Sequence, residues 1–133
     1  MKPSVLIVED DRLVARMLEK FLRAKGFDVS IAHGGHDAWN RLSCNDPPPV
    51  AVIDWSIHEI DGGELCRRVR ERVDAPFTYL VLMSGRFARY RSLAGPYLGA
   101  DECIAKPFRV EQVIEAVERG MGVARDRRGG TSP

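Results

Sequence analysis

The sequence predicts one α/β domain, built as a doubly wound five-stranded parallel sheet with five helices. Two observations lead to this fold class. The chain has 133 residues, which is enough for one hydrophobic core but not for two, so a two-domain enzyme is excluded. Short apolar runs rich in β-branched residues alternate with longer segments whose apolar residues recur at the helical period. This alternation favours parallel strands with a helix in each connection.

The five predicted strands are short and almost entirely apolar. They cover residues 5–8, 27–32, 50–53, 78–83 and 102–105. Strands that read as continuous apolar runs, rather than as alternating ones, are typical of a sheet that is covered by helices on both faces.

The first two helices are defined by an apolar stripe and by residues that stop a helix. One is predicted after Asp11 and ends at Gly26, as a C-terminal glycine would end it. Its expected inward face is Leu13, Val14, Met17, Leu18, Phe21 and Leu22. The second is predicted over residues 35–43, because the Asn-Asp-Pro-Pro-Pro segment at 45–49 cannot continue a helix.

Three further helices are predicted in the second half of the chain. One follows Asp61-Gly62-Gly63, and the last has an apolar stripe. In the helix after Gly63, the expected inward residues are Leu65, Val69 and Val73, and Arg67, Arg68, Arg70 and Arg72 are expected to face water. In the last helix, the expected inward residues are Val110, Val113, Ile114 and Val117. Between them, a fourth helix over residues 87–98 should be short or kinked, because it contains Gly95-Pro96.

The domain is expected to end at Gly122. Residues 123–133 are polar, contain glycine and show no period, so they are predicted to be a tail or the start of a linker. The predicted domain therefore covers residues 1–122.

Charge, hydropathy and cysteine content exclude several classes of protein. There are 20 basic and 19 acidic residues, a net charge of +1, which does not favour direct binding to nucleic acid or to a membrane surface. No apolar run approaches the roughly 20 residues of a membrane span, and the start of the chain does not resemble a signal peptide. Cys44, Cys66 and Cys103 form neither a disulfide framework nor a zinc motif, so a cytoplasmic location is expected. Cys66 and Cys103 are expected at inward positions.

Chemically reactive side chains follow the predicted strands at their carboxyl ends, where doubly wound sheets bind ligands. The residues are Glu9, Asp10 and Asp11 after the first strand, Asp54 after the third, Ser84-Gly85 after the fourth and Lys106 after the fifth. Glu9, Asp10 and Asp54 set against Lys106 leave an excess of two negative charges. Crowded carboxylates of this kind indicate a hard divalent cation, and Mg²⁺ fits.

In these motifs the chain resembles the receiver domain of two-component response regulators over about residues 4–122. The matching segments are Val8-Glu-Asp-Asp11, Val52-Ile-Asp-Trp55, Asp61-Gly62, Leu82-Met-Ser-Gly85 and Lys106-Pro-Phe108. Each motif alone is weak, whereas five in this order at strand ends are a strong signal. The resemblance implies the flavodoxin-like strand order 2-1-3-4-5.

The resemblance also implies roles for single residues. Asp54 would take a phosphoryl group from a histidine kinase or a phosphotransfer protein, assisted by Lys106 and Ser84. Mg²⁺ would be held by Glu9, Asp10, Asp54 and the backbone carbonyl of Ser56. The protein would phosphorylate itself and lose the group slowly, without turnover of an external substrate. Output would pass to a downstream protein or to a C-terminal output domain, and a homodimer is left open.

Three residues or pairs depart from the family pattern. Cys103 stands where a Tyr or Phe is usual, His58 stands where a proline is usual, and Gly95-Pro96 interrupts the fourth helix. They favour an alternative, in which the domain binds a partner with weak or absent phosphorylation-dependent switching. The third departure also concerns a helix of the family's common output surface.

Several of these residues and their neighbours have an alternative interpretation. Asp11 can be a helix N-cap as well as a metal ligand. His33-Gly-Gly-His36 is a poor metal motif and is expected to be a surface loop. A phosphatase of the haloacid-dehalogenase type is disfavoured, because that class carries Asp-x-Asp after its first strand and this chain does not.

Overall fold

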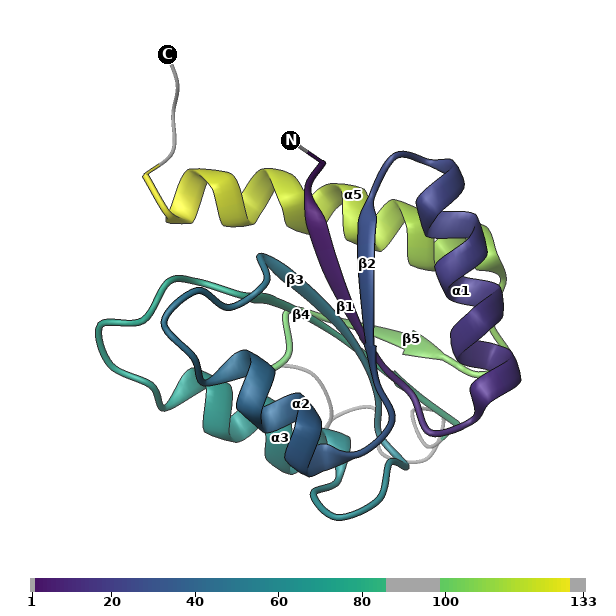
Figure 1. Ribbon diagram of the computed structural model, residues 1–133, viewed down its shortest axis with the longest axis horizontal. Coiled ribbons are helices and arrows are strands. Elements are labelled where there is room, and N and C mark those ends of the chain that lie inside the picture. Colours follow the sequence, from purple (N-terminus) through teal and green to yellow (C-terminus); the bar gives the residue numbers. More distant parts are fainter. Residues whose placement is uncertain (1, 86–98, 130–133) are drawn as a thin grey trace.

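A five-stranded parallel sheet forms the centre of the computed structural model, which describes residues 2–85 and 99–129 (Figure 1). The strand order is β2-β1-β3-β4-β5, and every neighbouring pair is parallel, as the sequence predicts. The strands are β1 (Ser4–Val8), β2 (Asp28–Ala32), β3 (Val50–Asp54), β4 (Tyr79–Ser84) and β5 (Glu102–Ala105). Each lies within about one or two residues of its predicted range.

Helices cover both faces of the sheet. They are α1 (Arg12–Ala24), α2 (Gly35–Leu42), α3 (Gly62–Arg70) and α5 (Val110–Arg127). In Figure 1, α1 and α5 lie on one side of the strands, and α2 and α3 lie on the other. Within the described residues there are thus four helices rather than five. The predicted fourth helix over residues 87–98, with Gly95-Pro96, lies outside them.

The sheet separates two hydrophobic clusters. Leu6, Ile53 and Leu80 pack toward α2 and α3, where Leu65 of α3 meets them. The alternate strand residues pack toward α1 and α5; they include Val5, Ile7, Val52 and Val81, with Leu18 and Val117 from the helices. All five residues of β3 and all six of β4 are buried. A strand that is covered on both faces has to be apolar throughout, which explains the continuous apolar runs.

Two of the predicted inward faces are wrong in part. In α1 the buried residues are Ala15, Leu18 and Leu22, whereas Leu13 is 81% exposed and Phe21 is also exposed. The small Ala15 lets the helix approach the sheet on a face that is rotated away from Leu13. Val73, expected to be buried, is 81% exposed, because α3 ends at Arg70 and Val73 lies beyond it.

The last helix is longer than predicted. α5 continues to Arg127, so the expectation of a polar tail is wrong for residues 123–127. Its inward face continues with Gly120 and Ala124, which hydrophobic periodicity does not register because both are small. A Cβ at Gly120 would lie 2.5 Å from the Tyr79 ring, so only glycine permits this packing. Arg128 then anchors the helix end by donating to the carbonyls of Phe77 and Pro47.

The sequence predicts one solvated row of arginines in the third helix, but the arginines in α3 and just after it do not form such a row. Arg67 and Arg68 pair with Glu64 at the surface, as expected. Arg70, however, donates from Nε to the Gly99 carbonyl at 2.7 Å and from Nη1 to the Thr78 carbonyl at 2.9 Å, and it also pairs with Asp101. Arg72 donates to the Leu42 carbonyl at 2.6 Å. Both therefore connect elements that are distant in sequence.

Among the described residues, no helix combines the length and the apolar character that crossing a membrane requires.

Candidate functional site

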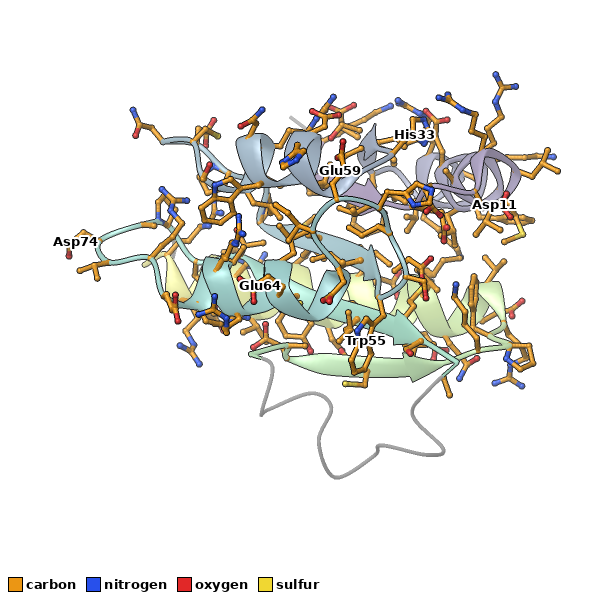
Figure 2. All side chains as sticks on the ribbon, turned by 90° about the horizontal axis from the view of Figure 1, so that it is seen from below. Asp11, His33, Trp55, Glu59, Glu64 and Asp74 are labelled. Atoms are coloured by element: carbon orange, nitrogen blue, oxygen red, sulfur yellow. The ribbon has the colours of Figure 1, made fainter. Side chains whose placement is uncertain are left out.

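The predicted site residues come together at the carboxyl ends of four strands. Glu9 follows β1, Asp54 ends β3, Ser84 ends β4 and Lys106 follows β5. The strand register pairs Asp54 with Met83 and Ser84 with Ala105, which brings the ends to one level. In Figure 2 the strand arrowheads point toward the side where Asp11 and Trp55 are labelled, and Asp74 lies at the opposite end. The parallel topology therefore assembles the site.

Three carboxylates form a compact group at this edge. Glu9, Asp10 and Asp54 each offer an oxygen, and these oxygens lie within 4.8 Å of one another. Within residues 2–85 and 99–129, no other group of at least three His, Cys, Asp or Glu side chains is close enough to hold a metal ion. Glu9 and Asp54 are only 2% and 3% exposed, whereas Asp10 is half-buried. The site is thus open to solvent on the Asp10 side.

A lysine neutralises part of this charge. Lys106 Nζ lies 2.9 Å from Asp54 Oδ1. The position of Lys106 is fixed through its backbone, because its N–H donates to the Ser84 carbonyl at 3.0 Å. The Lys106-Pro107 peptide bond is cis. Ser84 itself is buried beside the site, at 2% exposure.

Glu9 is the residue whose surroundings most clearly favour a bound cation. Its Oε2 accepts from the Asp11 N–H at 3.1 Å, but its buried Oε1 has no hydrogen-bond partner among the described residues. Burial, followed by the charge of Asp54, raises the pKa of Glu9 to about 7. A buried carboxylate oxygen without a donor is costly, and a hard cation would satisfy it. The three clustered side chains offer carboxylate oxygens, which fit Mg²⁺.

The raised pKa of Glu9 predicts that the metal-free protein loses stability as the pH rises. Between pH 4.5 and about 7, folded Glu9 holds a proton that the unfolded chain has released. The free energy of unfolding should therefore fall through this window, by at most about 3 kcal/mol. Urea denaturation in a chelator at pH 5 and pH 8 measures it.

The matched variants isolate this contribution. Glu9→Gln should flatten the fall in the free energy of unfolding between pH 5 and pH 8. Glu118→Gln, at an exposed position of α5, should leave that fall unchanged. Addition of Mg²⁺ at pH 8 should restore stability to the unmodified protein, because it compensates the ionised carboxylates. An equal pH dependence in Glu9→Gln and the unmodified protein would contradict the assignment to Glu9.

The loop after β3 is held close beneath Asp54. The Ser56 N–H lies 3.4 Å from Asp54 Oδ1, and the Gly62 N–H donates to the Trp55 carbonyl at 2.8 Å. A Cβ at Gly62 would lie 2.6 Å from the Asp54 carbonyl oxygen. Only glycine therefore allows α3 to begin this close to the acid cluster, which gives the Asp61-Gly62 motif a physical reason.

Two residues of the same loop make contacts that connect it to other elements. His58 Nε2 lies 3.2 Å from Asp10 Oδ2, so the histidine noted in the sequence does reach the site. Glu59, at φ +78°, accepts from the His36 N–H at 3.0 Å and supplies the side-chain cap that Gly34 cannot give α2. This role of Glu59 could not be predicted from the sequence, because a cap from a distant loop leaves no local pattern.

The alternatives for the neighbouring residues are resolved by their contacts. Asp11 is the N-cap of α1, with its carboxylate accepting from Leu13 and Val14, and it is outside the acid cluster. His33 Nδ1 bonds to the Glu9 carbonyl at 3.0 Å and forms no metal group with His36. Cys66 is buried, as predicted. The inward position expected for Cys103 is wrong, because it occupies an exposed position on edge strand β5.

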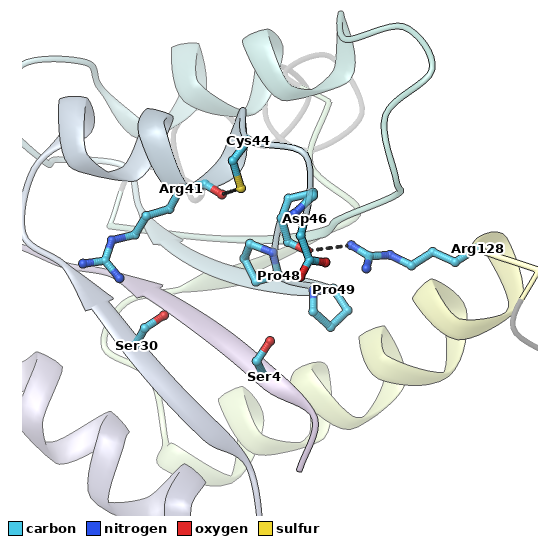
Figure 3. Close-up of a pocket in the computed structure, with 9 residues that line it drawn as sticks. Ser4, Ser30, Arg41, Cys44, Asp46, Pro48, Pro49 and Arg128 are labelled. Atoms are coloured by element: carbon cyan, nitrogen blue, oxygen red, sulfur yellow. Dashed lines mark hydrogen bonds between the residues drawn. The ribbon is translucent and has the colours of Figure 1, made fainter. Parts of the chain in front are cut away.

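A separate pocket of about 300 Å³ lies at the other end of the sheet (Figure 3). Ser4, at the start of β1, and Pro49, before β3, are among its lining residues. The dashed line at Arg128 in Figure 3 is its hydrogen bond to the Pro47 carbonyl. The pocket thus lies near the start of β1 and the loop before β3, away from the acid cluster.

Comparison with known proteins agrees with this geometry. A family model for the response regulator receiver domain matches residues 5–118. The receiver domain of the Francisella response regulator 1452 is 25% identical, with a TM-score of 0.83, and the match covers 92% of this chain and 98% of that one. The BeF3-activated DrrB receiver domain is 26% identical, with a TM-score of 0.77 and coverage of 92% and 99%.

A third solved structure shares the fold at lower identity. It is the receiver domain of the sensor histidine kinase PA1611 from Pseudomonas aeruginosa, with a magnesium ion coordinated in its active-site cleft. That chain is 19% identical, with a TM-score of 0.78, and the match covers 92% of this chain and 99% of that one.

Proposed function

Because this chain belongs to the response regulator receiver domain family, we propose that Asp54 accepts a phosphoryl group from a phosphohistidine and that the resulting aspartyl phosphate switches protein–protein interactions. The observation that carries the proposal is the buried Asp54 carboxylate, which lies 2.9 Å from Lys106 Nζ and belongs to the acid cluster. A nucleophile, a cation and metal-binding oxygens at one edge are the parts that phosphoryl transfer needs.

The chemistry assigns a role to each side chain. A carboxylate oxygen of Asp54 forms a bond to phosphorus while the bond between phosphorus and the histidine nitrogen breaks, and the imidazole leaves with its electron pair. Lys106 stabilises the phosphoryl oxygens after it releases Asp54, and the Ser84 hydroxyl donates to one of them. Gly85 leaves the approach of the donor open, because a Cβ there would meet no atom of the described residues.

Glu9, Asp10, Asp54 and the backbone carbonyl of Ser56 would hold Mg²⁺ in this proposal. When bound, the ion neutralises the charge of the carboxylates and of the incoming phosphoryl group. The support in this chain is the orphaned Glu9 Oε1 and the spacing of the three carboxylates.

The biological setting follows from the family. The phosphodonor would be a histidine kinase or a phosphotransfer protein in the cytoplasm, and the phosphorylated domain would act on a downstream protein or on an output domain. Residues 1–122 with the rest of α5 would form the folded unit. No external substrate is expected to be turned over.

The proposal predicts a covalent adduct that depends on Mg²⁺. Incubation with a small acyl phosphate and Mg²⁺ should add the mass of one phosphoryl group, and the same mixture in a chelator should give little or none. Intact mass spectrometry measures the adduct, and peptide mapping should place it on Asp54. The proposal fails if no adduct forms at any Mg²⁺ concentration.

A second candidate function is a receiver-like module that binds its partner without regulated phosphotransfer. It is favoured by Cys103, because this strand position carries a small side chain instead of the aromatic ring that is usual in the family. Beryllofluoride, a phosphoryl mimic, distinguishes the two. Altered amide spectra from Ser84 to Lys106 would support switching, and unchanged spectra with bound beryllofluoride would support the module.

A further inference from the structure

His58 brings an imidazole nitrogen to the edge of the acid cluster. Its Nε2 lies 3.2 Å from Asp10 Oδ2, and Asp10 is also the least buried of the three clustered carboxylates. The His58 side chain is 80% exposed, and Asp10 is its partner in the one ion pair that involves it among the described residues. A shift of the ring toward a bound metal ion would therefore break no other ion pair of His58 among the described residues.

The distance between the two side chains suits ligands of one metal ion. Two ligand atoms at about 2.1 Å from a metal lie about 3.0 Å apart in neighbouring octahedral positions and about 3.4 Å apart in a tetrahedron. The observed 3.2 Å falls between these values. The backbone around His58 is also fixed, because its carbonyl accepts from the N–H groups of Gly35 and Ile60, each at 2.9 Å.

An added imidazole changes which metals the donor set prefers. Carboxylate and carbonyl oxygens suit Mg²⁺, whereas imidazole suits the later first-row transition metals. Mg²⁺ keeps several water ligands and gains little when a nitrogen replaces one of them. A first-row transition metal gains a ligand that it binds more strongly than water.

We propose that His58 is a metal ligand that extends the site of Glu9, Asp10 and Asp54, so that the site takes Mn²⁺ or Co²⁺ with one nitrogen in its coordination shell as well as Mg²⁺. The inference deepens the proposed function and rests on it in one respect, that Asp10 binds the cation. The occupancy of the site would then depend on which divalent metal is available.

The test compares the unmodified protein with His58→Ala and with a matched control, His36→Ala. His36 is exposed at the start of α2, and its backbone N–H rather than its ring makes the contact with Glu59. Mn²⁺-loaded samples are examined by electron spin echo envelope modulation, which detects a nitrogen bound to the metal. Calorimetric titration measures Co²⁺ and Mg²⁺ affinities of the same three proteins.

The expected result is nitrogen modulation in the unmodified protein and in His36→Ala, and none in His58→Ala. The Co²⁺ affinity should fall about tenfold in His58→Ala, while the Mg²⁺ affinity changes less than about twofold. Modulation that persists in His58→Ala, or none in the unmodified protein, would overturn the inference. So would a rise in Co²⁺ and Mg²⁺ affinity on removal of His58, because His58 would then be a competitor for Asp10.

The two proposals fail in different ways. A protein that binds Mg²⁺ and forms the phosphoryl adduct, but shows no bound nitrogen, keeps the proposed function and loses the role of His58. Asp10→Asn should weaken the binding of both metals. If neither metal binds the unmodified protein, the acid cluster is not a metal site and both proposals lose their common premise.

Discussion

Asparagine in place of Asp54 is expected to abolish the phosphoryl adduct without unfolding the protein. The amide cannot attack phosphorus as the carboxylate does, and no other clustered acid is paired with Lys106. The intact mass after incubation with an acyl phosphate and Mg²⁺ should therefore stay unchanged in Asp54→Asn.

The fold should tolerate this change because two effects oppose each other. The variant relieves the repulsion that helps raise the pKa of Glu9, and it weakens the contact with Lys106, whose side chain is one-third exposed and can be hydrated. We expect the free energy of unfolding in a chelator to change by less than about 1 kcal/mol. The Mg²⁺ affinity should fall at the same time.

The control for Asp54→Asn is Asp61→Asn. Asp61 is exposed at the N-cap of α3, where its carboxylate accepts from the Glu64 N–H at 2.8 Å, and asparagine is an equally good cap. This variant should keep the adduct and the Mg²⁺ affinity. An adduct of unchanged yield in Asp54→Asn would show that another residue is the acceptor and would refute the proposed function.

Alanine in place of Arg70 is expected to destabilise the protein strongly. Arg70 donates to the carbonyls of Gly99 and Thr78, pairs with Asp101, and lies over the Phe77 ring at 4.9 Å. The side chain is largely buried, at 27% exposure. Its removal takes a donor from two carbonyls and from the Asp101 carboxylate, which keeps the Leu80 N–H, and this should lower the free energy of unfolding by about 2–4 kcal/mol.

Arg67→Ala is the matched control, because Arg67 is on the same helix one turn earlier. It pairs with Glu64 and Glu71 at the surface, where such ion pairs are screened by water and contribute little. Urea denaturation of both variants measures the difference. Equal losses of stability would contradict the assignment of Arg70 as the connection between α3 and the starts of β4 and β5.

The sequence predicted the sheet better than the helix faces, and the reason lies in the two kinds of pattern. A strand covered on both faces is apolar throughout, so Val50–Asp54 and Tyr79–Ser84 are visible as runs. A helix buries one stripe, and small residues such as Ala15, Gly120 and Ala124 can occupy it. Leu13 and the end of α5 were misassigned for this reason, whereas Val73 was misassigned because α3 ends at Arg70, before it.

The residues proposed for the site stand out in the sequence because they follow strands that are easy to recognise. The structure brings Glu9, Asp10 and Asp54 together and places Lys106 on Asp54. Contacts between loops left no such trace. Glu59 caps α2 from the loop after β3. Arg70 was expected to face water because of its charged neighbours, but it donates to the Gly99 carbonyl instead.

By itself, the sequence determined the fold class, the family and the residues at the strand ends, because each is recorded in local runs of adjacent residues. Only the tertiary structure decided which carboxylate oxygen of Glu9 is left without a donor, that His58 reaches Asp10, and that Arg70 is internal. These properties depend on the distance and burial of groups far apart in the chain. Hydrogen bonds, ion pairs and desolvation act through such distances and leave no period in the sequence.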